Sequence, residues 1–284
     1  MPLLDRTGTP EAVPSKASLV EQALAPFRRI AHHRRLLWRT TLVDLKSAYA
    51  GSLLGTIWVG LGPLLMLSLY ALIYAVIFRV RPTNMTVAEY VLYVFCGLVP
   101  FLAFASSLTA GTLSLVSNRA LLLNTVFPAE LIPLRAVLVA SASMPVGGVI
   151  LLAGDLGLST PSVTALLIPL VMVMQIMFTV GLCWMLSLLA LLIRDIQQLL
   201  YYITMLLLTI TPIAYTPDMI PSQLALIMYL NPLYYFAISF QSLIILNQIP
   251  PLHVLIIGSG ISLGFFIVGY AVCTRAKQVF YDYA

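Results

Sequence analysis

Long apolar runs without charged residues alternate along this chain with short polar segments. Several runs reach the length of about 20 residues that an α-helix needs to cross a hydrocarbon core roughly 30 Å thick. The expected spans cover about residues 53–78, 90–112, 132 or 136–152, 162–193, 197–213 and 254–273. The pattern therefore predicts an all-α membrane protein with six transmembrane helices, the fifth of which is broken at Pro212.

The composition excludes an ordinary water-soluble protein. Of the 284 residues, 61% are hydrophobic and 9% are charged, and the mean hydropathy is +1.00. A typical soluble domain is about 25% charged. Because so few charges cannot cover a soluble surface, the apolar residues are expected to face a bilayer.

The N-terminal part of the chain is polar and basic. Residues 1–25 hold scattered Pro, Gly and charge, and we predict a mobile tail there. Over residues 26–51 the basic residues form a helical stripe beside an apolar, aromatic stripe, which predicts an amphipathic helix in the membrane interface. The residues expected to meet lipid headgroups are Arg28, Arg35, Trp38, Arg39 and Lys46. The alternative is a juxtamembrane helix that only sets the topology.

The basic residues also orient the predicted spans. With the N-terminus placed inside, 13 of the 15 Lys and Arg residues fall on inner segments, and only Arg79 and Arg81 fall outside. Cytoplasmic loops carry the excess of basic residues. We therefore expect both termini in the cytoplasm, with residues 276–284 as a cytoplasmic C-terminal tail.

The segment 214–251 fits neither a loop nor a span. It lacks Lys and Arg, is rich in Leu, Ile and Tyr, and contains several prolines. We predict a short re-entrant pair of outer helices before the last span, divided near Asn231 and Pro232, because non-helical backbone at that depth must be buried in protein or line a cavity. The expected outer gate residues are Pro212, Pro221, Asn231 and Pro232. A hairpin resting on the membrane is the alternative.

No motif for catalysis or nucleotide binding is present in the sequence. None of the lysines (Lys16, Lys46, Lys277) follows a glycine, so there is no P-loop. The three cysteines lie in apolar runs, and no metal site or catalytic residue is expected. No ionisable group is predicted at mid-membrane depth, which argues against ion-coupled transport. We expect a chain that is not an enzyme and binds no cofactor of its own.

An inner segment at about residues 117–128 is predicted to form a short helix. Ser117 or Asn118 can cap it and Pro128 ends it. Its apolar residues, with charge at the margins, suit a socket in a soluble partner protein. The expected contact residues are Asn118, Arg119, Leu121, Leu122, Phe127, Pro128 and Glu130. A helix lying on the inner leaflet is the alternative.

Four stretches of the sequence carry a resemblance to a known family. They are Leu42–Trp58, Gly97–Phe101, Ser117–Glu130, and a group formed by Arg194–Ile196, Thr211–Tyr215 and Tyr229–Pro232. In this order and spacing they resemble the membrane subunit of ABC-2 type exporters, in the group that exports O-antigen, teichoic acid or capsular polysaccharide. The resemblance extends over nearly all of residues 36–275.

The resemblance implies a mechanism and its partners. It implies a homodimer of this chain in the bacterial inner membrane, whose transmembrane domain covers residues 52–275. Two copies of a separate ABC ATPase would bind ATP and Mg²⁺ and move the helix near residues 117–128, which would act as a coupling helix. A lipid-linked polysaccharide would meet the basic interface helix, and no nucleic acid is expected as a partner.

Aromatic side chains suit the path of a sugar polymer, because a flat ring stacks on the apolar face of a pyranose. The tyrosines expected to line the channel are Tyr70, Tyr74, Tyr201, Tyr202 and Tyr215. Each of them alternatively anchors the chain at the lipid interface. Two other functions remain open from the sequence: an ABC-2 type exporter of drugs or small molecules, and a membrane scaffold that transports nothing.

Overall fold

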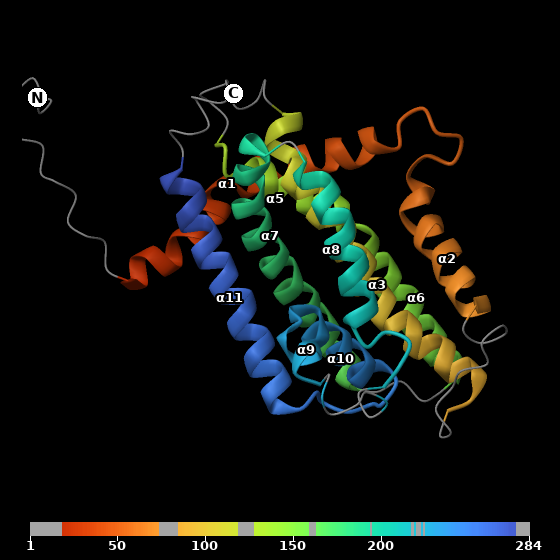
Figure 1. The fold of residues 1–284 in the computed structure, drawn as a ribbon. Coiled ribbons are helices and arrows are strands. Elements are labelled where there is room, and N and C mark those ends of the chain that lie inside the picture. Colours follow the sequence, from red (N-terminus) through yellow and green to blue (C-terminus); the bar gives the residue numbers. More distant parts are fainter. Residues whose placement is uncertain are drawn as a thin grey trace, which may run out of the picture.

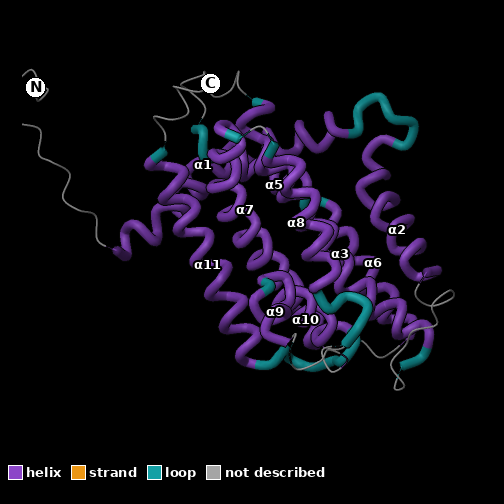
Figure 2. Tube along the Cα trace, in the orientation of Figure 1, coloured by secondary structure: helices purple, strands orange, loops and turns teal. Residues whose placement is uncertain are grey.

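The computed structural model describes residues 19–73, 85–118, 128–158, 163–193, 195–216, 219, 223 and 225–276. Within these residues every regular element is a helix (Figures 1 and 2). The longer helices are α1 Leu19–Ala48, α2 Trp58–Ala71, α3 Val87–Ser117, α5 Leu131–Ala140, α6 Ser143–Leu158, α7 Ile168–Leu192, α8 Ile196–Ile210, α10 Pro232–Ile244 and α11 Leu252–Arg275. The short ones are η1 Gly55–Ile57, η3 Val163–Leu167 and α9 Ala225–Leu230.

Four helical segments of the described chain are long and apolar enough to cross a membrane. They are Val87–Ser117, Leu131–Gly157, Val163–Leu192 and Leu252–Arg275, and they match the second, third, fourth and sixth predicted spans. The first and fifth predicted spans correspond to the shorter apolar helices Gly55–Tyr70 and Ile196–Ile210. A helix the length of α8 rises about 22 Å, less than a hydrocarbon core of roughly 30 Å. The number of six spans therefore stays a prediction.

The amphipathic N-terminal helix begins earlier than its sequence suggests. The helix was expected to begin at residue 26, yet α1 begins at Leu19 and Pro26 lies inside it. The residues before Pro26 include good helix formers, Glu21, Leu24 and Ala25. The helix therefore occupies part of the segment that was predicted to be a tail.

Local sequence explains where two of the membrane helices begin and break. The α3 helix starts at a capping box, in which the Glu89 amide donates to Thr86 Oγ1 at 3.3 Å and the Thr86 amide donates to Glu89 Oε2 at 2.7 Å. The third predicted span is divided into α5 and α6 by a turn at residues 141–142. Pro145 has no amide proton for the carbonyl of Ser141, which favours a break there.

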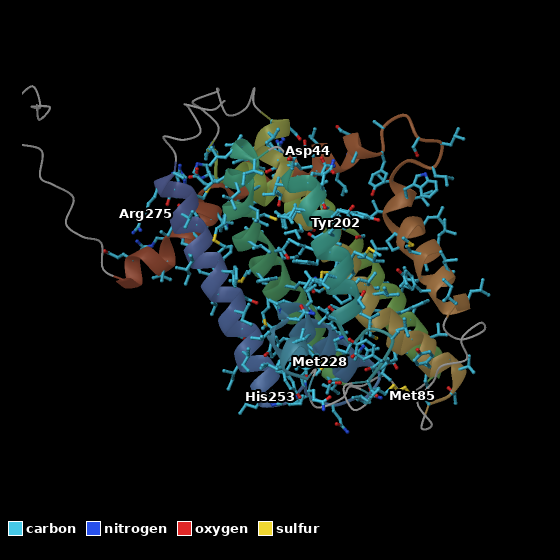
Figure 3. The ribbon with its side chains drawn as sticks, viewed as in Figure 1. Asp44, Met85, Tyr202, Met228, His253 and Arg275 are labelled. Carbon is cyan, nitrogen blue, oxygen red and sulfur yellow. The ribbon has the colours of Figure 1, made fainter. Side chains whose placement is uncertain are left out.

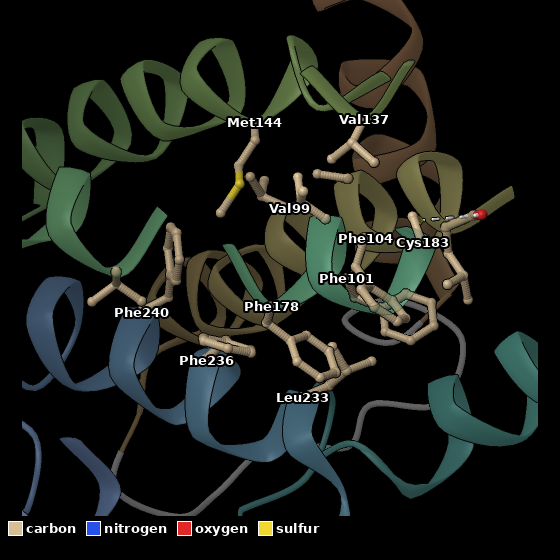
Figure 4. Close-up of a cluster of buried hydrophobic side chains, with 14 of the residues drawn as sticks. Val99, Phe101, Phe104, Val137, Met144, Phe178, Cys183, Leu233, Phe236 and Phe240 are labelled. Carbon is tan, nitrogen blue, oxygen red and sulfur yellow. Dashed lines mark hydrogen bonds between the residues drawn. The ribbon is translucent and has the colours of Figure 1, made fainter. Parts of the chain in front are cut away.

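Helix α3 lies at the centre of the bundle and packs against α5, α6, α7 and α10. Figure 4 shows part of this core, where Phe104 of α3 and Phe178 of α7 stack with ring centroids 5.9 Å apart. The α7–α11 contact is the most extensive in the bundle. It depends on glycine, because a Cβ at Gly181 would overlap the carbonyl of Phe265, and one at Gly269 would overlap the backbone of Gly181.

The two ends of the bundle differ in charge. Helix α1 crosses one end, where Asp44 and Arg275 are also found, while Met228 and His253 lie at the other end (Figures 1 and 3). We call the first the basic end and the second the gate end. The bundle thus separates the described members of the predicted coupling and headgroup residues from the described members of the predicted outer gate.

Candidate functional site

At the basic end, α1 is joined to the start of α5 by a buried carboxylate. Arg29 Nε donates to Glu130 Oε1 at 2.8 Å, and the side chain of Glu130 is only 2% exposed while that of Arg29 is 39% exposed. The backbone carbonyl of Glu130 accepts a hydrogen bond from Trp184 Nε1 at 2.8 Å. Glu130 therefore faces α1 and α7, although the sequence suggested a contact with a soluble partner.

A second ion pair joins α1 to α5 farther along the interface helix. Arg135 Nε lies 2.8 Å from Asp44 Oδ2, and Arg135 is 10% exposed. The same guanidinium donates from Nη2 to Asn118 Oδ1 at 3.2 Å, and Asn118 ends α3 by donating from Nδ2 to the carbonyl of Ser114 at 2.8 Å. The end of α3 is thus connected through Arg135 to α1.

The predicted coupling helix lies largely outside the described residues. Arg119, Leu121, Leu122 and Phe127 fall in the segment 119–127, about which the structure says nothing. Asn118, Pro128 and Glu130 are described and stand at its two ends. The Pro128 carbonyl accepts the Leu131 amide at 3.0 Å, which begins the first turn of α5.

The predicted headgroup residues lie on the exposed side of α1. Arg28, Arg35, Arg39 and Lys46 are exposed, and Trp38 is 65% exposed. The buried residues of the same helix, Pro26, Leu37 and Thr41, are spaced by 11 and 4 residues, which are about three turns and one turn, so they share one face and point to the bundle. The helix therefore has one side against protein and one basic side with an indole, as an interfacial helix requires.

An apolar groove runs beside the C-terminal end of α1. It has a volume of about 440 Å³ and is lined by Leu45 and Tyr49, by residues of α2 including Trp58 and Gly62, and by residues of α3 and the α5–α6 break. A Cβ at Gly62 would meet no atom within 4 Å, so this glycine leaves the groove open. Exposed Lys46 adjoins Leu45 in the sequence, which places a cation near an apolar recess.

At the gate end, a non-helical segment follows α8. Its backbone carbonyls are satisfied by side chains from other helices: Gln241 Nε2 donates to the Pro212 carbonyl at 2.9 Å, and Tyr90 Oη donates to the Ala214 carbonyl at 2.8 Å. A Cβ on Gly97 of α3 would lie 3.0 Å from the Ile213 Cα, so only a glycine fits closely there. Irregular backbone between apolar helices is thereby kept paired.

Asn231 joins the two short helices of the gate end to α8. Its Oδ1 accepts the Leu233 amide at 3.0 Å and caps α10, with Pro232 in the first helical position. Its Nδ2 donates to Thr211 Oγ1 at 2.8 Å. The helix pair α9–α10 divides at Asn231 and Pro232, where the sequence predicted its division. Pro221 lies outside the described residues.

The predicted channel tyrosines occupy different surroundings. Tyr201 and Tyr202 on α8 are 65% and 67% exposed, with ring centroids 5.4 Å apart. Tyr215 donates to the Ile210 carbonyl at 2.6 Å, and burial raises the pKa of its hydroxyl, so it stays a donor. Tyr70 on α2 is half-buried against the core. Tyr74 lies outside the described residues.

Several residues of these two sites were not singled out from the sequence. Gln241 and Tyr90 pair the backbone after α8, and Trp184 and Arg29 hold Glu130. A signal available for Gln241 was its polar amide within an apolar helix, because such a group requires a hydrogen-bond partner when it is buried.

The sequence is similar to that of known permeases, although no family model matches it. Two proteins of Klebsiella pneumoniae, each described as O-antigen export system permease protein RfbA, are 35% and 34% identical over 213 residues, which are 73% of this chain and 79% of each relative. A protein of Myxococcus xanthus with the same description is 27% identical over 226 residues, which are 78% of this chain and 85% of the relative.

Proposed function

The chain belongs to the family of ABC-2 type O-antigen export permeases, and we propose that it forms the membrane path of an ABC transporter that exports an O-antigen polysaccharide. The observation that carries this proposal is the similarity to permeases of O-antigen export over 73% of the chain. The subunit is a transport protein, and hydrolysis of ATP belongs to a separate ATPase. The absence of any P-loop lysine from the sequence agrees with that division.

The proposed assembly is a homodimer of this chain with two ATPase subunits, which hold the ATP and Mg²⁺. Within the described chain α8 buries only Ile196 and Leu200, and Tyr201 and Tyr202 stand on its open side. A second copy facing this side would enclose a path between two sets of exposed tyrosines. Stacking of rings on sugar faces would then guide the polymer without fixing it in one place.

The proposed topology places the basic end in the cytoplasm of a bacterium and the gate end outside the inner membrane. The basic residues of α1, with Arg135 and Arg275, gather at the former end, which supports this orientation by the positive-inside rule. Six spans result if α2 and α8 also cross the membrane, with both termini in the cytoplasm. The pair α9–α10 would then be the re-entrant outer gate.

A lipid-linked polysaccharide is the proposed substrate, and the basic end offers complementary surfaces for its two parts. Exposed Arg39 and Lys46 on α1 suit an anionic headgroup, and the groove beside Tyr49 and Trp58 suits a hydrocarbon tail. We propose that the lipid anchor of the substrate lies in this groove before the polysaccharide is moved.

Deletion of the gene, followed by analysis of polysaccharide at the cell surface and inside the cell, tests the proposed function. We expect loss of surface O-antigen and accumulation of lipid-linked polysaccharide in the cytoplasm, both reversed by the wild-type chain. Unchanged surface polysaccharide would refute the proposal. Increased sensitivity to drugs without a polysaccharide defect would instead favour an exporter of small molecules.

A further inference from the structure

Helix α8 is attached to the rest of its own chain mainly at its two ends. Within the described residues it buries only Ile196 and Leu200, which lie near its start. The side that carries Tyr201 and Tyr202 is open, and both rings are exposed (Figure 3). Buried residues return directly after the helix, at positions 211–213. The direction in which the open side faces therefore depends on how this following segment is held.

Two side-chain donors from other helices hold the segment after α8. Gln241 Nε2 of α10 donates to the Pro212 carbonyl at 2.9 Å, and Tyr90 Oη of α3 donates to the Ala214 carbonyl at 2.8 Å. Gln241 is only 1% exposed, and a carbonyl in such a place needs a donor from the protein because water is excluded. The two carbonyls are two positions apart on the same chain, so a turn of the segment about its own axis would break both hydrogen bonds.

The residue between these two carbonyls is fixed by packing. Ile213 is 4% exposed, and its Cα would lie 3.0 Å from a Cβ on Gly97 of α3. This close approach blocks movement toward α3, while movement away from α3 would break the hydrogen bond from Tyr90. The segment is continuous with α8, because the Thr211 amide donates to the Leu207 carbonyl at 2.9 Å. Any turn of the segment is therefore passed to the helix.

We propose that Gln241 and Tyr90 are positioning residues for transport, because they fix the rotation of α8 and with it the direction in which its exposed tyrosines face. The inference rests on the proposed function, in which Tyr201 and Tyr202 line the path of the polysaccharide. The ends of side chains lie about 5–6 Å from a helix axis, so a turn of about 40° moves a ring by roughly 4 Å. A shift of that size is comparable to one van der Waals contact distance and would separate a ring from the sugar that it stacks on.

Thiol labelling of the complete transporter in permeabilised membranes measures this rotation. Single cysteines replace Ile203 or Leu208, which lie about 100° and 120° to either side of Tyr202 around α8. The probe is a charged maleimide, which reacts with thiols in contact with water, and the three native cysteines are buried. Because loss of one buried hydrogen bond shifts an equilibrium about fivefold, we expect Gln241→Met to speed labelling at one position and slow it at the other by up to that factor. Equal changes at both positions, or none, would overturn the inference.

Export of O-antigen gives the functional readout, with Gln175→Met as the matched control. Gln175 of α7 is likewise a buried amide, 2% exposed, and its Nε2 donates to the Pro100 carbonyl within α3 at 2.6 Å. We expect Gln241→Met to lower surface O-antigen about fivefold, and Gln175→Met to keep both export and labelling within about twofold of wild type. Equal losses of export in the two variants would mean that a buried amide serves only stability, and would overturn the inference.

A milder variant decides the question if Gln241→Met accumulates poorly in the membrane. Tyr90→Phe keeps the ring and removes only the hydroxyl that donates to the Ala214 carbonyl. We expect it to change labelling in opposite senses at Ile203 and Leu208 and to lower export. Normal export with unchanged labelling would overturn the inference. Failure of the wild-type chain to restore surface O-antigen to a deletion strain would instead refute the proposed function.

Discussion

Replacement of Asn231 tests whether the gate end is held together as described. Its side chain caps α10 through the Leu233 amide at 3.0 Å and donates to Thr211 at 2.8 Å, while the residue is 4% exposed. Loss of an N-cap costs about 1 kcal/mol, and loss of a buried hydrogen bond costs about 1 kcal/mol more. We therefore expect Asn231→Ala to lower the free energy of unfolding by about 2 kcal/mol, which corresponds to roughly 4–8 °C in Tm for a chain of this size.

The assay is thermal unfolding of the purified chain in detergent, with variants that separate the two contributions. Asn231→Ser keeps a capping oxygen but lacks the amide donor, so we expect about half of the effect. Thr211→Val removes the acceptor, and in the Asn231→Ser background it should cost about 1 kcal/mol less than in the wild type. A Tm of Asn231→Ala within a degree of the wild-type value, or strictly additive effects of the two changes, would refute this account of the gate end.

Three further predictions concern the groove, the helix crossing and the exposed tyrosines. Gly62→Trp should fill the groove and lower surface O-antigen about tenfold, whereas Gly157→Trp, at another open position, should leave it near wild type. Gly269→Leu should lower the free energy of unfolding by about 3 kcal/mol, because the new side chain forces α7 and α11 apart. Gly264→Leu, on an open side of α11, should change the free energy of unfolding by less than about 0.5 kcal/mol. Thermal unfolding measures both effects. Tyr202→Ala should lower export about fivefold, the loss of one aromatic contact of roughly 1 kcal/mol, and Tyr202→Phe should restore it.

Much of the fold follows from hydrophobic patterning. Uncharged runs located the four long apolar helices, because length and lack of charge alone identify them. The division at Asn231 and Pro232 was also predictable, since an asparagine followed by proline is a helix start. The resemblance to polysaccharide export permeases is confirmed by relatives of 34–35% identity.

Other features depend on tertiary contacts that no local pattern encodes. The early start of α1 reflects good helix formers before a proline that was taken as its boundary. Arg29 and Glu130 are separated by 101 positions, so their pairing requires knowledge of how α1 crosses the bundle. In the sequence Arg29 was one of several cations in a basic stretch, and Glu130 was placed at the margin of a partner-binding helix. In the structure the Glu130 side chain is buried and forms an ion pair with Arg29.

Transport by the purified complex in proteoliposomes tests the central claim most directly. The chain and its ATPase are reconstituted together, lipid-linked O-antigen is supplied on the side of the ATPase, and polysaccharide that reaches the opposite side is measured by its protection from added glycosidase. The account predicts transfer that requires ATP and Mg²⁺ and disappears when the P-loop lysine of the ATPase is replaced. Transfer without ATP, or none at all while ATP is hydrolysed by an intact wild-type complex, would contradict it.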